Sequence, residues 1–379
     1  MASTRRRTDG ARRIAGLSRI LFSALAHRTA SIGRRRPPEK PRRILVAHHL
    51  LLGDTLMLTP LLAKLRERFP DAEIVMAVPE AHAGLYANRP YGVQAIGWNG
   101  DLAEASLLWP QRGFDLAYVP ADNRFSWLAL ALGARWIVAF SGDRPAYKSW
   151  PVDEERPYPD APTAWSDMNG LLVDGPPPQR YSTRSWQPPA VALTTKPERR
   201  YAVLHVGAST PLKCWQPERW LALADWFHAQ GIEPVWSGGR GEEPLVAACD
   251  PDGRYRSYAG KLSLPELWHL LAGAEMLVSP DTGVSHLGRV VGVPTVTLFG
   301  PGSHIVNGAG DFWADAPLRA VTVDPFPCRD QHDLFKRDVI WVRRCGRSTA
   351  ECSHPRCMDE IDLAKVTAAI VELQGLAQK

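Results

Sequence analysis

Two stretches of this chain alternate short apolar runs with helical patterns, and this alternation constrains the fold more than any other feature. In the first stretch, an apolar run at residues 44–47 precedes a helical pattern over 56–69, and another apolar run follows at 72–78. Apolar runs of this length, bounded by turns, are typical of strands buried on both faces of a parallel sheet. The order strand, loop, helix, strand therefore predicts the start of a doubly wound α/β domain.

The helical pattern over 56–69 has an apolar side and a charged side. We expect Lys64, Arg66 and Glu67 to face solvent, because leucines occupy the helical positions that would pack on the sheet. Further elements of the same array are expected as strands at 93–96, 116–119 and 137–140 and a helix at 127–132.

A proline-rich stretch over 174–200 interrupts the alternation, and such stretches are typical of connections between domains. The alternation then starts again, with strands expected at 201–205, 232–236, 276–279 and 295–299 and helices at 217–230 and 264–272. A chain of 379 residues is long enough for two such cores. We therefore predict an α/β protein with two Rossmann-like, doubly wound parallel-sheet domains that face one another across a cleft.

The predicted division of the chain is a basic arm at 1–43, an N-terminal Rossmann-like domain at 44–185, a linker at 186–200, a C-terminal Rossmann-like domain at 201–360 and a C-terminal helix at 361–379. Doubly wound sheets bind their ligands at the carboxyl ends of the strands. The loops at those ends are therefore where functional residues are expected.

One of these loops, Asp281-Thr282-Gly283, stands between an apolar run and a helical pattern. A turn of small residues at this place presents free backbone N–H groups and the positive end of a helix dipole, which can hold a phosphate or diphosphate. A substrate activated by a nucleotide is therefore one hypothesis. The alternative is that Asp281 or Thr282 only caps the helix that follows.

Two more loops of the second array hold residues suited to the same ligand. Lys213 could neutralise a departing diphosphate, and the hydroxyls of Ser209 and Thr210 could donate to its oxygens. Gly238 and Gly239 would let the backbone approach a nucleoside closely. Each has a plainer alternative, namely a solvated lysine, hydroxyls that cap a helix, and turn glycines.

In the first array, Asp54 follows Gly53 near the start of the helical pattern. A carboxylate is a poor partner for a phosphate, but in the cleft it could act as the general base that takes a proton from an incoming hydroxyl. The alternative is an N-cap aspartate with no part in catalysis.

Several segments resemble the motifs of one family. They are Arg43-Ile44-Leu45-Val46 with Leu52-Gly53-Asp54-Thr55, His205-Val206-Gly207-Ala208-Ser209 with Lys213-Cys214-Trp215, Ala259-Gly260-Lys261-Leu262, and Asp281-Thr282-Gly283-Val284-Ser285-His286 with Phe299-Gly300-Pro301. In this order, over roughly residues 43–370, the chain is similar to glycosyltransferase family 9, the ADP-heptose:lipopolysaccharide heptosyltransferases.

The resemblance implies a GT-B fold and an inverting transfer of a sugar, heptose from ADP-heptose, onto a lipopolysaccharide core or related glycolipid. It implies that Asp54 is the catalytic base, and we expect Lys213 to neutralise the departing diphosphate. The donor site is expected to comprise Ser209, Thr210, Gly238, Gly239, Glu242, Leu262, Asp281, Thr282, Gly283 and His286. The C-terminal domain would bind the donor and the N-terminal domain the acceptor, with no metal and no cofactor.

Two other functions stay open. One is a different nucleotide-sugar enzyme of the same architecture, such as a hexosyltransferase or an epimerase, and an epimerase would turn over with no acceptor present. The other is a member that binds a nucleotide-sugar but forms no product with any acceptor.

Residues 1–43 form a strongly basic arm, with a formal charge of +11 against −6 for the rest of the chain. Within it, Ile14, Leu17, Leu21 and Leu25 recur at helical spacing, which predicts a short amphipathic helix in a membrane interface. We therefore expect a cytoplasmic protein held at the inner face of the inner membrane, with an anionic glycolipid acceptor and no nucleic acid partner. A cleaved signal peptide and a disordered arm are the alternatives.

Four of the six cysteines, Cys328, Cys345, Cys352 and Cys357, lie near the end of the chain and include no Cys-x₂-Cys pair. Their spacing requires neither a metal nor disulfides, and a four-cysteine metal site or a disulfide clip stays open.

Overall fold

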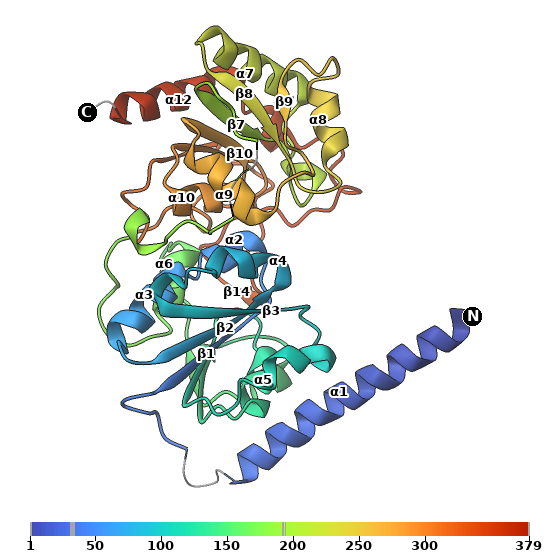
Figure 1. The fold of residues 1–379 in the computed structure, drawn as a ribbon, viewed down its shortest axis with the longest axis vertical. Coiled ribbons are helices and arrows are strands. Elements are labelled where there is room, and N and C mark those ends of the chain that lie inside the picture. Colours follow the sequence, from blue (N-terminus) through green and yellow to red (C-terminus); the bar gives the residue numbers. More distant parts are fainter. Residues whose placement is uncertain (1, 31–34, 192, 194, 378–379) are drawn as a thin grey trace.

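The computed structural model describes residues 2–30, 35–191, 193 and 195–377, and Figure 1 shows them as two α/β domains stacked one above the other. Each domain contains a parallel six-stranded sheet, and the orders β3-β2-β1-β4-β5-β6 and β9-β8-β7-β10-β11-β12 are the same arrangement repeated. In both sheets the order reverses between the first and fourth strands, which creates a crevice at the carboxyl ends. The predicted fold class is confirmed.

The N-terminal domain, lower in Figure 1, opens with β1 (Arg43–Ala47), whose Ile44 pairs with Ile74 on one side and Leu116 on the other. Its other strands are β2 (Glu73–Pro79), β3 (Val93–Trp98), β4 (Leu116–Val119), β5 (Trp136–Phe140) and β6 (Glu154–Arg156). Its helices are α2 (Leu52–Leu56), α3 (Thr59–Arg68), α4 (Glu80–Ala83), α5 (Phe125–Ala131) and α6 (Trp165–Gly170), with short 3₁₀ turns η1 (Gly84–Tyr86), η2 (Pro90–Gly92), η3 (Leu102–Leu108), η4 (Ala146–Ser149) and η5 (Thr183–Ser185).

The C-terminal domain repeats this plan and adds a small hairpin. Its strands are β7 (Tyr201–His205), β8 (Glu233–Ser237), β9 (Arg256–Ser257), β10 (Met276–Pro280), β11 (Thr295–Phe299) and β12 (Leu318–Thr322), followed by the hairpin β13 (Asp333–Leu334) and β14 (Arg337–Asp338). Its helices are α7 (Pro217–Ala229), α8 (Glu243–Cys249), α9 (Leu264–Ala272), α10 (Gly283–Val291), α11 (Arg356–Asp359) and α12 (Leu363–Ala377), with the 3₁₀ turn η6 (Pro211–Lys213).

The expected strands at 116–119, 201–205 and 295–299 and the expected helix at 264–272 have the bounds that the structure gives them. The edge strand β3 was predicted, but the edge strands β6, β9 and β12 were not; β6, for example, has three residues and reads Glu-Glu-Arg. The hairpin β13–β14 was not predicted either, since two strands of two residues leave no periodic pattern. The exact domain boundaries stay predictions.

The expectation that Lys64 faces solvent is wrong. The expected helix is divided into α2 and α3, and Lys64 on α3 is only 6% exposed. Helix α3 packs against α6, and Nζ of Lys64 donates a 3.0 Å hydrogen bond to the backbone oxygen of Gly170 at the end of that helix. A long lysine stem can be buried in this way when its ammonium group finds a carbonyl partner.

Helix α1 (Ala2–Ala30) is longer than the short helix that the arm predicts; its N-terminal end projects away from the N-terminal domain, and its later part runs beside α5 (Figure 1). Ile20 and Ala24 are buried against that domain, and Arg28 forms a 3.1 Å ion pair with Asp153. The apolar residues of the predicted membrane face, Ile14, Leu17, Leu21 and Leu25, are exposed, as is Phe22. None of the helices in the described part of the chain is long and apolar enough to cross a membrane.

Apolar packing continues from one domain into the other near the linker. One cluster of buried side chains contains residues of β1 and α3 together with residues of α9 and α10. Trp186 connects the two domains within this cluster. Its ring centroid lies 5.9 Å from that of Trp268 in the C-terminal domain, and its Nε1 donates a 3.0 Å hydrogen bond to the backbone oxygen of Leu85 in the N-terminal domain. The first residue of the predicted linker therefore contacts both domains.

Candidate active site

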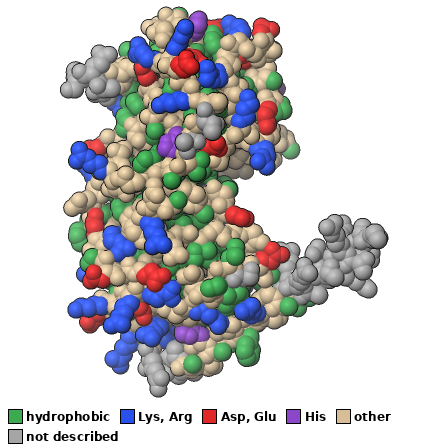
Figure 2. Space-filling view, viewed as in Figure 1, with side chains coloured by type: hydrophobic (Ala, Val, Ile, Leu, Met, Phe, Trp, Pro, Cys, Tyr) green, Lys and Arg blue, Asp and Glu red, His purple; other side chains and the backbone are tan. Residues whose placement is uncertain are grey.

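The surface is notched on one side where the two domains meet (Figure 2). A cavity of about 370 Å³ lies between the domains, and nearly all of the residues predicted for the site line it. They are Asp54, Ser209, Lys213, Gly238, Gly239, Glu242, Leu262, Asp281, Thr282, Gly283 and His286. These residues follow β1, β7, β8, β9 and β10, so the parallel topology brings them to one place.

Thr210 is the predicted site residue that this cavity does not include. Its hydroxyl accepts a 3.4 Å hydrogen bond from the N–H of Leu212 and so caps η6. This geometry agrees with the capping alternative that the sequence left open for Thr210.

Asp54 lies on α2, just beyond the carboxyl end of β1, and is the acidic residue that the N-terminal domain contributes to the cavity. Burial raises the pKa of Asp54 to about 6, and the negative charge of Asp281 adds to this effect. The positive charges of Lys213 and Arg344 act in the opposite direction. A carboxylate with a pKa near neutral is suited to accept a proton at physiological pH.

Lys213 and Asp281 form a pair on the opposite wall. Nζ of Lys213 donates to the backbone oxygen of Asp281 at 2.7 Å and to its Oδ2 at 3.0 Å. Nδ2 of Asn307 donates to both carboxylate oxygens, at 3.2 and 3.1 Å. Asp281 is only 3% exposed, so its carboxylate fixes the ammonium group of Lys213 at the edge of the cavity.

Helix α10 begins at this cavity without a side-chain cap. Thr282 is its N-cap residue, but the hydroxyl of Thr282 lies 3.2 Å from that of Ser279 and makes no capping hydrogen bond. The first-turn N–H groups of α10 are therefore not satisfied by a capping side chain, and they point toward the cavity end of the helix. The capping alternative for Asp281 and Thr282 is not what the structure shows.

His286, in the first turn of α10, is buried and lines the cavity. Burial holds the pKa of His286 well below its usual range, and the charges of Arg289 and Lys213 act in the same direction. The imidazole is therefore neutral at pH 7. Its Nδ1 is buried and has no hydrogen-bond partner among the described residues.

Two glycines allow the domains to approach at this point. A Cβ added to Gly283 would stand 2.7 Å from Cβ of Leu52, and one added to Gly53 would stand 2.8 Å from Cδ2 of His286. Contacts this short are not compatible with a side chain, so α2 and α10 meet only because both positions are glycine.

Glu242 brings a carboxylate to the far end of the cavity, where its Oε2 accepts a hydrogen bond from the N–H of Gly239. A Cβ on Gly207 would overlap the Glu242 carboxylate, which accounts for glycine at that position. Glu242 is the N-cap residue of α8, beyond the loop that follows the second strand of this sheet, a region where an acidic side chain can accept hydrogen bonds from sugar hydroxyls.

Several lining residues were not predicted. Asn307, His205 and Ser237 line the cavity, and Arg344 acts electrostatically on Asp54. His205 and Ser237 end their strands, a position that could have identified them, and they lie 3.2 Å apart. Asn307 and Arg344 belong to irregular segments and had no such signal.

No group of three or more His, Cys, Asp or Glu side chains within the described ranges could hold a metal ion. The thiols of the four late cysteines are all free. Burial raises the pKa of the Cys357 thiol to about 11. The prediction that the site needs no metal stays a prediction.

Two stacked Rossmann-like domains with a cavity between their strand ends define a GT-B protein. A sequence model of "Glycosyltransferase family 9 (heptosyltransferase)" matches residues 112–316, and the chain belongs to this family. The family resemblance and the prediction of a glycosyltransferase are thereby confirmed.

Curated relatives agree with the family match. The chain is 24% identical to lipopolysaccharide heptosyltransferase 3 of Escherichia coli over 313 aligned residues. This alignment covers 74% of this chain and 90% of that protein. It is also 24% identical to lipopolysaccharide heptosyltransferase 1 of Pseudomonas aeruginosa over 327 aligned residues, which make up 77% of this chain and 90% of that protein. The solved structure of E. coli ADP-heptose lipopolysaccharide heptosyltransferase II has the same fold, with a TM-score of 0.67, 18% identity, and coverage of 89% of this chain and 100% of that one.

Proposed function

We propose that this glycosyltransferase moves heptose from ADP-heptose onto a lipopolysaccharide core or a related anionic glycolipid, with inversion at the anomeric carbon. The observation that carries the proposal is that Asp54 of one domain and the first turn of α10 in the other line the same cavity. The relatives named as lipopolysaccharide heptosyltransferases, and the neighbour named for ADP-heptose, support the choice of sugar and acceptor.

The donor binds mainly to the C-terminal domain. Its diphosphate lies against the N–H groups at the start of α10, and Lys213 neutralises part of its charge. Gly238 and Gly239 leave room for the nucleoside, and Glu242 accepts hydrogen bonds from its hydroxyls. Since a helix dipole and an ammonium group already face the diphosphate, no metal is required.

Transfer is a direct displacement. The carboxylate of Asp54 takes the proton of an acceptor hydroxyl, whose oxygen forms a bond to the anomeric carbon. The bond from that carbon to the diphosphate breaks on the opposite face, and its electron pair leaves with the phosphate oxygen. Lys213 stabilises the charge that develops there, which accelerates the step because the charge is greatest in the transition state.

Helix α1 holds the enzyme at the cytoplasmic face of the inner membrane, where a glycolipid acceptor would be presented. Its exposed residues Ile14, Leu17, Leu21, Phe22 and Leu25 supply an apolar surface. Lys and Arg side chains are frequent on the end of the N-terminal domain next to this helix (Figure 2). Apolar side chains combined with basic ones are what an anionic interface binds.

The direct test is the release of ADP from ADP-heptose with and without a lipid A–Kdo acceptor. We expect release that depends on the acceptor, and loss of turnover by about 10² to 10⁴ in an Asp54→Ala variant. Full turnover in that variant would exclude Asp54 as the base. Turnover without an acceptor would favour an epimerase, and donor binding without any product would favour a protein that only binds the nucleotide-sugar.

A further inference from the structure

Asp54 faces a second cavity as well as the first. This second cavity has a volume of about 350 Å³ and shares Asp54, Lys213, Asp281 and Asn307 with the larger one. The two cavities therefore meet at the carboxylate that would take the proton. A reaction with two substrates needs such an arrangement, with one substrate on each side of the base.

The outer wall of the second cavity comes from residues 326–347, which we call the strap. The strap follows the last strand of the C-terminal sheet and contains the hairpin β13–β14. Near its start, Arg329 is buried, and its guanidinium group donates to the oxygens of Gly300 at 2.9 Å and Phe299 at 3.1 Å. This end of the strap is fixed to the C-terminal domain.

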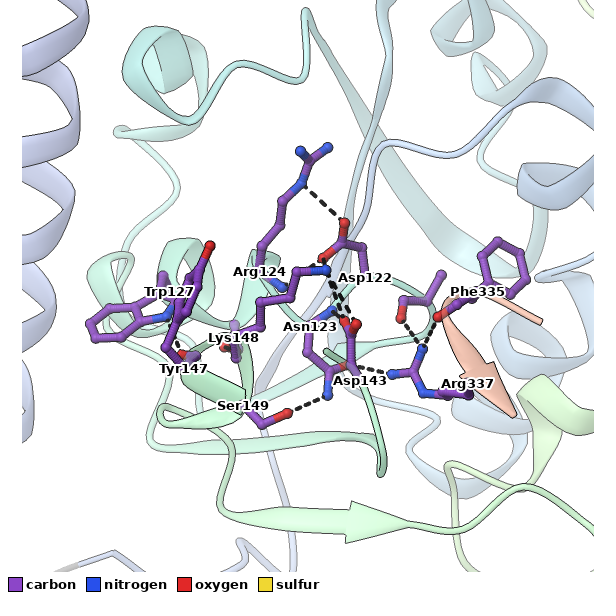
Figure 3. A network of polar contacts seen from close by, with 12 residues as sticks. Asp122, Asn123, Arg124, Trp127, Asp143, Tyr147, Lys148, Ser149, Phe335 and Arg337 are labelled. Carbon is purple, nitrogen blue, oxygen red and sulfur yellow. Dashed lines mark hydrogen bonds and ion pairs between the residues drawn. The ribbon is translucent and has the colours of Figure 1, made fainter. Parts of the chain in front are cut away.

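The hairpin of the strap is fixed to the other domain. Arg337 on β14 is only 4% exposed, and Figure 3 shows it reaching Asn123. Its guanidinium group donates to Oδ1 of Asn123 at 2.9 Å and to the backbone oxygens of Ala121 at 2.8 Å and Ser141 at 2.7 Å. Nδ2 of Asn123 in turn donates to Oγ of Ser149 at 2.8 Å, so the side chain of Asn123 that binds Arg337 is itself held in place (Figure 3).

Arg344 lies in the part of the strap that lines the second cavity. Its Nε donates to Oε1 of Gln331 at 3.2 Å, but within the described chain it forms no ion pair with a carboxylate. The other cations of this cavity are paired, Lys213 with Asp281 and Arg347 with Asp330. The positive charge of Arg344 is therefore the one left unmatched, and it lies close enough to Asp54 to act on it.

We propose that the second cavity is the acceptor subsite, that it takes a sugar bearing a carboxylate or phosphate group, and that Arg344 binds this anion while the acceptor hydroxyl faces Asp54. The inference rests on the proposed glycosyl transfer. It places the acceptor between the two domains, against the strap, and not on the N-terminal domain alone. Arg344 is then a specificity residue, because a planar guanidinium group pairs well with either anion.

The test is calorimetric titration of the full chain, saturated with ADP, with two matched pairs of probes. One pair is Kdo, which carries a carboxylate, and its neutral methyl ester; the other is a glucose phosphate and glucose. We expect the charged member of at least one pair to bind about 10- to 100-fold more tightly in the wild type. Arg344→Gln should abolish this difference, and Arg344→Lys should restore part of it.

Arg343→Gln is the matched control. Arg343 is the neighbouring residue, but its side chain is exposed. Its guanidinium group donates to the backbone oxygen of Ile340 and contacts the ring nitrogen Nδ1 of His332, which does not line the cavity. This variant should keep the wild-type preference. The pair that depends on Arg344 identifies whether the anion is a carboxylate or a phosphate.

The proposal is overturned if Arg344→Gln keeps the preference for the charged probe, or if the wild type shows no preference in either pair. Neither measurement requires turnover. Failure of the wild type to release ADP from ADP-heptose with any glycolipid would contradict the proposed function instead, so the two failures are distinguishable.

Discussion

Gly53 of the N-terminal domain lies directly against His286 of the C-terminal domain, and a Cβ on Gly53 would stand 2.8 Å from Cδ2 of the histidine. Gly53 immediately precedes Asp54, and His286 lies in the first turn of α10. One contact therefore sets the position of the proposed base relative to the helix end that would hold the diphosphate. The relative placement of the two domains at this contact is a catalytic requirement in the mechanism that we propose.

Gly53→Ala should therefore impair both packing and transfer. The added methyl group must displace His286 or α2, and overpacking of this kind costs about 1–3 kcal/mol of unfolding free energy. We expect a kcat at least tenfold lower, because small misplacement of reacting groups slows a displacement strongly. Gly375→Ala on α12 is the control, since a Cβ there meets nothing within 4 Å: kcat should stay unchanged, and the higher helix propensity of alanine should raise the free energy of unfolding by up to about 1 kcal/mol. Wild-type kcat in Gly53→Ala would show that the contact does not position Asp54.

Transfer should be lost in acid as Asp54 becomes protonated. Burial raises the pKa of Asp54 to about 6, so the proton-accepting form predominates above pH 6 and declines below it. We expect kcat/KM for the acceptor, at saturating donor, to fall about tenfold for each pH unit below 6. Donor affinity, measured by calorimetry over the same range, serves as the control and should stay constant. A flat rate profile between pH 5 and 7 would contradict the assignment of Asp54 as the base.

Ionised Asp54 should also lower the stability of the folded protein. Its pKa rises from 3.8 in the unfolded chain to about 6, so the stabilising effect of its proton is complete below pH 3.8 and is lost as the pH rises through about 6. A difference of about two pKa units corresponds to at most about 3 kcal/mol. Asp54→Asn should therefore raise the free energy of unfolding at pH 8 by up to this amount and by much less at pH 4.

Chemical denaturation at the two pH values measures this effect. The exposed carboxylate of Asp252 provides the control, because Asp252→Asn should change stability little at either pH. Equal gains from Asp54→Asn at pH 4 and pH 8 would mean that packing, and not ionisation, is responsible.

Lys213 should contribute to both stability and catalysis, and a double variant can separate the two. Lys213→Met leaves the buried carboxylate of Asp281 with Asn307 as its remaining side-chain partner, at a cost of about 1–3 kcal/mol. Loss of charge stabilisation for the diphosphate should lower kcat by about 10² to 10³. Adding Asp281→Asn removes the unpaired charge, so stability should recover while kcat stays low. Recovery of kcat in the double variant would exclude the proposed role of Lys213.

The exposed apolar face of α1 should bind anionic membranes. Leu21→Glu combined with Phe22→Glu places charges at two exposed positions, so the fold should be retained. Because each inserted side chain is worth about 1.5–3 kcal/mol, we expect binding to phosphatidylglycerol vesicles in a flotation assay to fall more than tenfold. Val371→Glu changes an exposed apolar residue of α12 on the other domain and should have no effect. Wild-type protein that does not float, or a double variant that floats equally, would count against membrane binding by α1.

Most of the site residues that the sequence predicted lie in the loops that follow regular strands, although His205 and Ser237, which end their strands, were not predicted. Asp54, Lys213 and the turn before α10 belong to this set, and all line one cavity. Asn307 and Arg344 were not predicted, because they come from irregular segments that reach the site only after the whole domain has formed. For Thr210, the sequence left ligand binding and helix capping open, and its hydroxyl caps η6.

By itself, the sequence determined the element types, the two parallel sheets and the family, because periodicity and loop motifs act over a few residues and parallel topology brings the loops to one edge. Only the tertiary structure decided which side chains meet from distant parts of the chain. Gly53 against His286, the buried Lys64, and a strap that spans both domains and brings Arg344 toward Asp54 are all of this kind. Such contacts depend on how two folded domains pack against each other, and no local sequence pattern encodes that packing.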